Sequence, residues 1–345
     1  MKRLLITILI FFASTAFAKD NIVNVYNWAG YMPPEVIALF QKETGIKVNY
    51  STFDSNEDLY TKLKANSNID YDIAVPSAPY VQQMIRDGML RRLDKSKLIG
   101  FKNLNSTLLN QSYDPNNQYS IPYLWGTTGI IINTKYYSPK KINYWEALWQ
   151  PQFRGQLSFI NDMKDVFAMA LKVLGYSIND QNPKHIREAY LKLKALLPNI
   201  QSFEAGGAKH LYVNEDSNIG MIESGDAYII SQEKPSFKYI YPKDGPLIWT
   251  DNMVIPIGAK HVENAYEFIN FILRPDIAKM ISLGVGFSTP NAAAVKLLPK
   301  AAQENRVLNP TAKDLQNGEV EGAISLKTRG LYLKYWELLK LGGGI

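Results

Sequence analysis

The alternation of hydrophobic and polar positions predicts strands and helices that follow one another along the first part of the chain. Asn21 to Trp28 has the character of a strand, Pro33 to Glu43 has helical spacing, and Ile46 to Phe53 again has strand character. A second helix is predicted from about Ser55, and Asp72 to Pro76 is predicted to be a short buried strand. This order favours a parallel α/β architecture.

Two later segments predict strands that cross from one lobe to the other. These segments are Tyr119 to Asn133 and Trp249 to Ile257. Between them the pattern predicts helices over Val166 to Leu174 and Ile186 to Leu197, and a strand over Phe237 to Tyr241. Because the chain crosses twice, the first lobe must be discontinuous.

The length of the chain, 345 residues, is too great for one compact core and suits two domains. We expect lobe 1 to comprise residues 19–126 plus 250–295, and lobe 2 to comprise residues 127–249 plus 296–345. No linker rich in proline or serine separates them, so the hinge is expected to consist of strands.

The N-terminus predicts export. A basic start, an apolar run from Leu4 to Phe17 and the small-x-small sequence Ala16-Phe17-Ala18 are typical of a secretory signal peptide, residues 1–18, that is cleaved after Ala18. The apolar run is shorter than the roughly 20 residues that span a membrane. The chain has no cysteine, and therefore no disulfide and no lipid-bearing cysteine. We expect a soluble periplasmic protein of the Gram-negative type that is not anchored to the membrane.

The charge pattern argues against a nucleic-acid partner. Formal net charge is +6, and removal of Lys2 and Arg3 with the signal peptide would lower it to +4. The cations are scattered singly or in pairs such as Lys140-Lys141, without a basic stripe interleaved with aromatic residues. These positions are typical of a solvated surface.

Catalytic and cofactor motifs are not found in the sequence. It contains no phosphate-binding loop of the Walker type, no dinucleotide fingerprint and no nucleophile elbow. The three histidines lack the spacing of a metal site. We therefore expect no catalytic residue, no metal and no cofactor.

Two short segments could instead hold an organic cation. In the strand predicted at Trp249-Thr250-Asp251, residues two apart project to the same face, which places an aromatic ring beside a carboxylate. Asp162 and Asp165 stand where a strand gives way to a helix. Core packing of Trp249, a turn or capping role for Asp251 and helix capping by Asp162 are the alternatives, although a capping carboxylate can still present its second oxygen to a cleft.

With these residues in place, the chain resembles the periplasmic spermidine/putrescine-binding proteins that feed ABC transporters, most closely those of the spermidine-preferential type. The shared stretches run nearly end to end, and their number and order carry the resemblance. They are Tyr26-Asn27-Trp28, Lys42 to Val48, Tyr50-Ser51-Thr52, Val75-Pro76-Ser77, Leu93 to Leu98, Asp114 to Asn117, Tyr119 to Tyr123, Trp125-Gly126, Gly220-Met221-Ile222, Ile269 to Phe271, Leu273 to Asp276 and Thr289-Pro290-Asn291.

The resemblance implies a type II periplasmic-binding-protein fold, in which two α/β lobes joined by strand crossovers close over a ligand in the cleft between them. It implies that Trp28 and Tyr31 are cleft aromatics and that Ser77 is a polar contact. It also implies that Asp162 and Asp165 receive one amine. Trp249 would then lie against the methylene chain, and Asp251 would receive a second amine.

This sequence departs from the family pattern at several cleft positions. Ala29 and Gly30 stand where relatives carry a threonine and an acid, and Pro79 replaces a tyrosine, for which the neighbouring Tyr80 could substitute. Phe287 also replaces a tyrosine. Glu223 replaces a tryptophan and Glu321 a glutamine. Either glutamate could replace the lost amine contact, while the alternative for Glu223 is a surface residue in the polar turn Glu-Ser-Gly-Asp.

Three functional classes follow from this reading. The first is a monomeric receptor that binds spermidine or putrescine and delivers it to an inner-membrane ABC permease. The second is a periplasmic sensor that reports polyamine to a membrane signalling protein. The third, an enzyme that uses Asp162 and Asp165 as an acid and a base, is disfavoured because no nucleophile accompanies them.

Overall fold

The computed structural model describes residues 21–65, 71–204 and 209–343, and the predicted signal peptide lies outside these residues. The described strands are β1 (Ile22–Trp28), β2 (Lys47–Phe53), β3 (Ile73–Ala74), β4 (Ser120–Asn133), β5 (Leu157–Ile160), β6 (Ile200–Glu204), β7 (Ile219–Glu223), β8 (Phe237–Ile240), β9 (Leu247–Val254) and β10 (Glu319–Val320). The described helices are α1 (Pro34–Thr44), α2 (Asn56–Ala65), α3 (Ala78–Arg86), α4 (Met163–Val173), α5 (Pro183–Leu196), α6 (Lys209–Val213), α7 (Ser224–Glu233), α8 (Val262–Ile272), α9 (Pro275–Val285), α10 (Ala292–Val295), α11 (Lys300–Gln303) and α12 (Leu326–Gly343).

Local signals in the sequence explain where several elements begin and end. Helix α1 starts at a proline and ends at Gly45, whose positive φ of 69° suits a residue without a Cβ. Helix α4 begins at Met163, three residues before the predicted start, because the Asp162 carboxylate accepts a hydrogen bond from the Asp165 N–H. Strand β9 ends at Val254, before Pro256, which has no N–H to donate.

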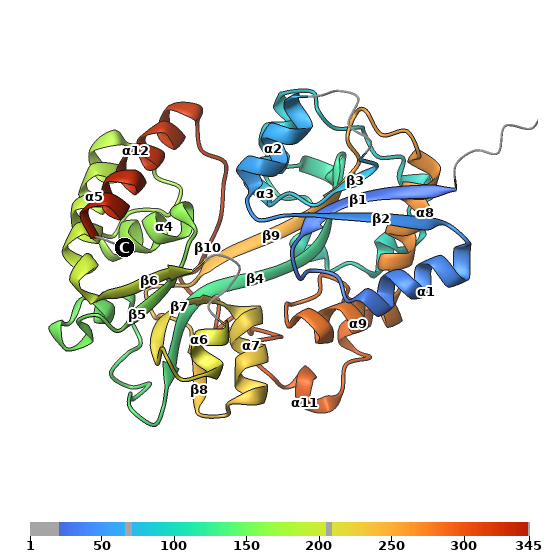
Figure 1. Ribbon diagram of the computed structural model, residues 1–345. Helices are drawn as coiled ribbons and strands as arrows, with labels where there is room; N and C mark the ends of the chain where they lie inside the picture. Colours follow the sequence, from blue (N-terminus) through green and yellow to red (C-terminus); the bar gives the residue numbers. More distant parts are fainter. Residues whose placement is uncertain (1–20, 66–70, 205–208, 344–345) are drawn as a thin grey trace, which may run out of the picture.

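One continuous sheet runs through both halves of the described molecule, in the order β2-β1-β3-β9-β4-β7-β5-β6, with β10 beside β9 and β8 beside β4. The pairs β1–β2 and β1–β3 are parallel, as the βαβ pattern predicts. The central strands β4 and β9 are antiparallel and lie side by side between the two halves (Figure 1). They are the two predicted crossings.

The crossing strands carry residues of both hydrophobic cores. Tyr123 and Leu124 of β4 pack in the core that α1, α8 and α9 cover, whereas Ile130 packs in the second core, with α4, α5 and α12. On β9, Leu247 belongs to the second core and Trp249 to the first. The ladder between the two strands is irregular between Pro122 and Leu124, so Tyr123 has no opposite partner on β9. The connection between the two cores is therefore made of sheet.

No helix among the described residues is long and apolar enough to span a bilayer.

Candidate functional site

Asp251 lies at the centre of the candidate site, on the crossing strand β9. Its side chain is only 2% exposed, and the Ser77 hydroxyl donates a hydrogen bond of 2.6 Å to it. A backbone bridge between Ser77 and Asp251 sets this pair. Burial raises the pKa of Asp251 to about 7, against the opposing effect of hydrogen bonds from Ser77 and Tyr31. The carboxyl group thus changes its charge near neutral pH.

Aromatic rings line the same part of lobe 1. The Trp249 ring lies edge to face with Phe287 at 5.1 Å between centroids, and Phe287 lies 5.1 Å from Tyr31. Trp28 extends the series, with its ring 6.1 Å from that of Tyr31. Trp249 is buried in the core and also neighbours Asp251 along the strand, so the core-packing and cleft interpretations of this residue are compatible.

The hydroxyl of Tyr123 fixes the position of Tyr31. It donates a hydrogen bond of 2.5 Å to the backbone carbonyl of Tyr31. Because Tyr123 occupies the irregular point in the β4–β9 ladder, this bond connects the crossing strands to the aromatic residues. Burial, followed by the charges of Asp251 and Glu223, holds the pKa of Tyr31 well above its usual value.

Lobe 2 contributes two acids from the start of helix α4. Asp162 is the N-cap and keeps contact with solvent, whereas Asp165 is 5% exposed and accepts a hydrogen bond of 2.6 Å from the Thr128 hydroxyl of β4. Partial desolvation by the surrounding protein, followed by the charge of Glu321, raises the pKa of Asp162 to about 6, although the residue is still exposed to solvent. Burial and Glu321 hold the pKa of Asp165 well above its usual value. Asp162 thus caps the helix and remains exposed to solvent.

Glu321 joins this pair from the segment that follows β10. It is 8% exposed, and its carboxylate lies 3.2 Å from the Lys164 ammonium. Burial would raise its pKa, but Lys164 and a hydrogen bond from Asp165 outweigh burial and lower it. The pKa values of Asp165 and Glu321 are thus displaced in opposite directions, because only Glu321 has a cation beside it.

Glu223 and Asp226 form the third acidic group, at the junction of β7 and α7. The predicted polar turn at this point is the first turn of helix α7, and Glu223 is partly buried. Burial and the carboxylates of Asp226 and Asp251 hold the pKa of Glu223 well above its usual value, with smaller contributions from Asp162 and Glu321. Burial also raises the pKa of Asp226 to about 6. The charges of acids from both lobes therefore influence one another through Glu223.

Tyr80 lies where the two lobes meet at the edge of this space. Its hydroxyl donates a hydrogen bond to Glu57, and the Arg329 guanidinium of α12 lies 4.5 Å from the centre of its ring. Arg329 also donates a hydrogen bond of 2.8 Å to Gln83 of α3. Helices from opposite lobes are thus joined beside the acids, with Tyr80 engaged in the contact.

Two of the positions that depart from the family pattern have a plain structural role. Gly30 adopts a positive φ of 76° in the turn after β1, with open space where a Cβ would lie. Pro79 is buried in the first turn of α3, where proline is well tolerated. Neither residue offers a charge to the space between the lobes.

The structure brings most of the predicted residues into this one region of the molecule. Tyr31, Ser77, Trp249, Asp251 and Phe287 meet in lobe 1, with Trp28 at the end of their aromatic series. Asp162, Asp165 and Glu321 meet in lobe 2, and Glu223 interacts electrostatically with both groups. Sequence reasoning missed Glu57, Lys164, Asp226 and Arg329, because each acquires its role through contacts that no local motif signals.

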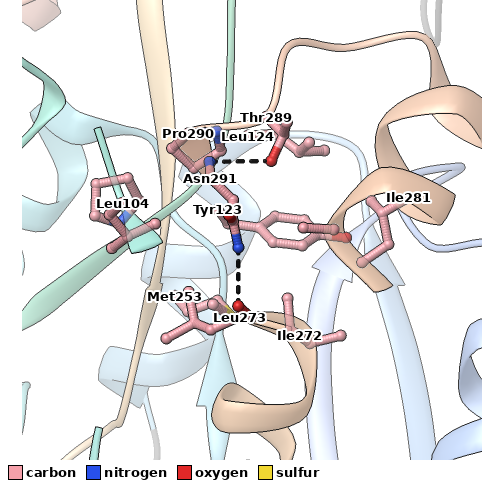
Figure 2. A pocket seen from close by; sticks show the side chains of 12 residues that line it. Leu104, Tyr123, Leu124, Met253, Ile272, Leu273, Ile281, Thr289, Pro290 and Asn291 are labelled. Atoms are coloured by element: carbon pink, nitrogen blue, oxygen red, sulfur yellow. Dashed lines mark hydrogen bonds between the residues drawn. The ribbon is translucent and has the colours of Figure 1, made fainter. Parts of the chain in front are cut away.

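A pocket lies within lobe 1, where residues of the crossing strands β4 and β9 form part of its lining. Figure 2 shows its lining residues around Asn291, whose side-chain amide donates a hydrogen bond of 2.8 Å to the Leu273 carbonyl. Its walls are mostly apolar and include Tyr123, Met253 and Ile281, with no acidic side chain among the lining residues. It offers no counter-charge for a cation.

Comparisons with known proteins match this arrangement. Residues 35–308 match the family described as bacterial extracellular solute-binding protein. The chain belongs to this family. The chain is 43% identical over 330 residues to the spermidine/putrescine-binding periplasmic protein of Escherichia coli K12, which covers 95% of this chain and 94% of that protein.

Two further relatives agree with this assignment. The putrescine-binding periplasmic protein PotF of Escherichia coli K12 is 33% identical, with 86% of this chain and 85% of that protein covered. The solved structure of the spermidine/putrescine ABC transporter substrate-binding protein PotD from Streptococcus pneumoniae has a TM-score of 0.81 and 36% identity, with 93% of this chain and 99% of that chain covered. The resemblance and the two-lobed α/β fold predicted from the sequence are thereby confirmed.

Proposed function

We propose that this protein is a periplasmic receptor that captures a polyamine, spermidine or putrescine, between its lobes and delivers it to an inner-membrane ABC permease. The observation that carries the proposal is the convergence of carboxylates from both lobes on a space walled by aromatic rings. The relatives named for spermidine and putrescine binding support the same ligand class.

The chemistry of polyamines suits such a site. Each ammonium group donates charge-assisted hydrogen bonds to carboxylates, and aromatic faces cover the methylene spacers and attract the cationic ends. We assign one amine to Asp162 and Asp165 and another to Asp251, with Ser77 as its neighbour. The aromatic contacts in this proposal are Trp28, Tyr31, Tyr80, Trp249 and Phe287.

Of the two glutamates that replace neutral residues of the family, Glu223 is better placed to take an additional amine contact. Glu321 already pairs with Lys164. The Glu223 carboxylate has no hydrogen-bond partner among the described residues, and acids surround it. An ammonium group would offset that repulsion.

The remaining parts of the proposal concern the whole protein. We propose cleavage after Ala18, a soluble monomer that binds no nucleic acid and catalyses no reaction, and closure of lobe 1 (residues 19–126 plus 250–295) on lobe 2 (residues 127–249 plus 296–345). The sheet that connects the two cores supports closure as a hinge motion.

A thermal-shift panel tests the ligand class. Putrescine, cadaverine, spermidine and norspermidine would each be added to the purified mature protein at low and at high salt. At about 100 times the Kd, mass action stabilises the protein by about 2.7 kcal/mol. We expect a Tm rise of roughly 5 °C with at least one polyamine, reduced by high salt. If none of the four raises the Tm, the proposal is wrong.

Calorimetric titration of Glu223→Gln refines the assignment. This variant keeps the shape of the side chain and removes the charge. We expect the Kd of the preferred polyamine to rise about tenfold, the size of one charge-assisted hydrogen bond. An unchanged Kd would exclude Glu223 from the site while leaving polyamine binding intact.

A further inference from the structure

Two lysine–glutamate ion pairs join helix α4 to the segment around β10. Lys172 lies 2.7 Å from Glu319, and Lys164 lies 3.2 Å from Glu321. Both lysines stand on one helix and both glutamates are two residues apart, so the pairs are built alike. They differ in their surroundings, because only the Lys164 pair adjoins Asp162 and Asp165.

Helix stability does not account for Lys164. It is the second residue of α4, where the positive end of the helix dipole disfavours a cation. Its side chain is nevertheless held at 16% exposure against Glu321. The protein thus places a cation of its own inside the group of acids to which the proposed function assigns a ligand amine.

The charges around Lys164 limit what a ligand can find there. Asp162, Asp165 and Glu321 supply three carboxyl groups, of which Glu321 already pairs with the Lys164 ammonium. Asp165 is 5% exposed and accepts a hydrogen bond from the Thr128 hydroxyl, which carries no charge. Asp162 and Asp165 can neutralise one terminal ammonium group of the ligand. A further amine of the ligand would face the like charge of Lys164.

We propose that Lys164 is a specificity-determining residue that disfavours a third ammonium group and so shifts selectivity from triamines toward diamines. This inference rests on the proposed function. In this proposal, the Lys164 ammonium permanently occupies the position that one amine of the ligand would otherwise take.

Calorimetric titration of putrescine and spermidine into the wild-type protein and Lys164→Met tests the inference. The substitution retains the apolar stem and removes the charge, which frees Glu321 for a ligand amine. We expect the ratio of the putrescine Kd to the spermidine Kd to rise at least about tenfold. In Lys164→Met combined with Glu321→Gln, the ratio is expected to return close to the wild-type value.

Lys172→Met is the matched control, since it breaks the equivalent ion pair on the same helix. Its ratio of the two Kd values is expected to stay at the wild-type value, even if its Tm falls. Equal changes of the ratio in both single variants, or no change in Lys164→Met, would overturn the inference.

If Lys164→Met does not fold, Glu321→Gln gives the converse test. It leaves Lys164 without its ion-pair partner, so spermidine is expected to lose several-fold more affinity than putrescine. Equal losses would again overturn the role of Lys164. Failure of the wild-type protein to bind either polyamine would instead refute the proposed function.

Discussion

Asp251 is a buried carboxyl group that can bind a cation in the interior of the protein. The carboxyl group is almost completely buried, and the Ser77 hydroxyl donates a hydrogen bond to it. This neutral donor satisfies an ionised oxygen but does not neutralise its charge. A ligand ammonium supplies the missing positive charge. The burial that raises the pKa of Asp251 also strengthens the attraction between the ammonium and the carboxylate.

The raised pKa of Asp251 predicts opposite pH trends for the ligand-free and ligand-bound protein. Because the pKa rises from 3.8 to about 7 in the folded protein, the stability gained from the bound proton is fully present below about pH 4. It is lost as the pH rises through 7, up to about 4 kcal/mol. Polyamine needs the ionised form, so the ligand-induced rise in Tm is expected to grow from pH 5 to pH 8.

Melting curves of the wild-type protein and Asp251→Asn at pH 4 to 8 check these trends. Without ligand, the wild-type Tm should fall relative to that of the variant as the pH rises. With putrescine, the shift should grow more from pH 5 to pH 8 in the wild-type protein than in Asp251→Asn, which keeps Asp162 with its pKa of about 6. A constant Tm difference between the two proteins across this range would contradict the pKa argument.

At the scale of elements, helix α12 contacts helix α3 of the other half of the molecule. Arg329 bonds to Gln83 and covers Tyr80, although these residues belong to opposite lobes. Tyr80 is fixed in turn by Glu57 of α2. A second contact is the close packing of Phe287 on Gly225, where a Cβ would lie 2.2 Å from the ring. Both contacts require the lobes to be together.

We predict that Arg329→Ala weakens polyamine binding about fivefold by destabilising the closed arrangement. The change removes one charged hydrogen bond and one cation–π contact, which are worth about 1 kcal/mol or more at a partly exposed site. The dissociation rate should rise, and stopped-flow displacement of bound polyamine measures it. Lys334→Ala removes an exposed cation from the same helix and should leave the rate unchanged. Equal rates in both variants would show that α12 does not hold the cleft.

For the whole molecule, the sequence was most informative where neighbouring residues determine structure. Strand β1 and helix α1 lie within a residue of their predicted bounds, and the Asp162 cap follows from its position before α4. Lys164 and Arg329 could not be assigned in this way. Glu321 lies 157 positions from Lys164, and Gln83 lies 246 positions from Arg329, so only the folded chain brings them together. A lone lysine or arginine on a helix otherwise indicates a solvated surface.

The continuous sheet also determines how this two-lobed protein should unfold. Strands β4 and β9 pair from Ser120–Val254 to Thr128–Leu247, and each contributes side chains to both cores. Neither core can melt without removing strands from the other, so the lobes should behave as one cooperative unit. Differential scanning calorimetry of the ligand-free protein should give one transition, with a calorimetric enthalpy equal to the van't Hoff enthalpy. Two separable transitions would contradict this coupling. A ligand that binds only between the lobes would then protect every part of the chain equally against thermal unfolding.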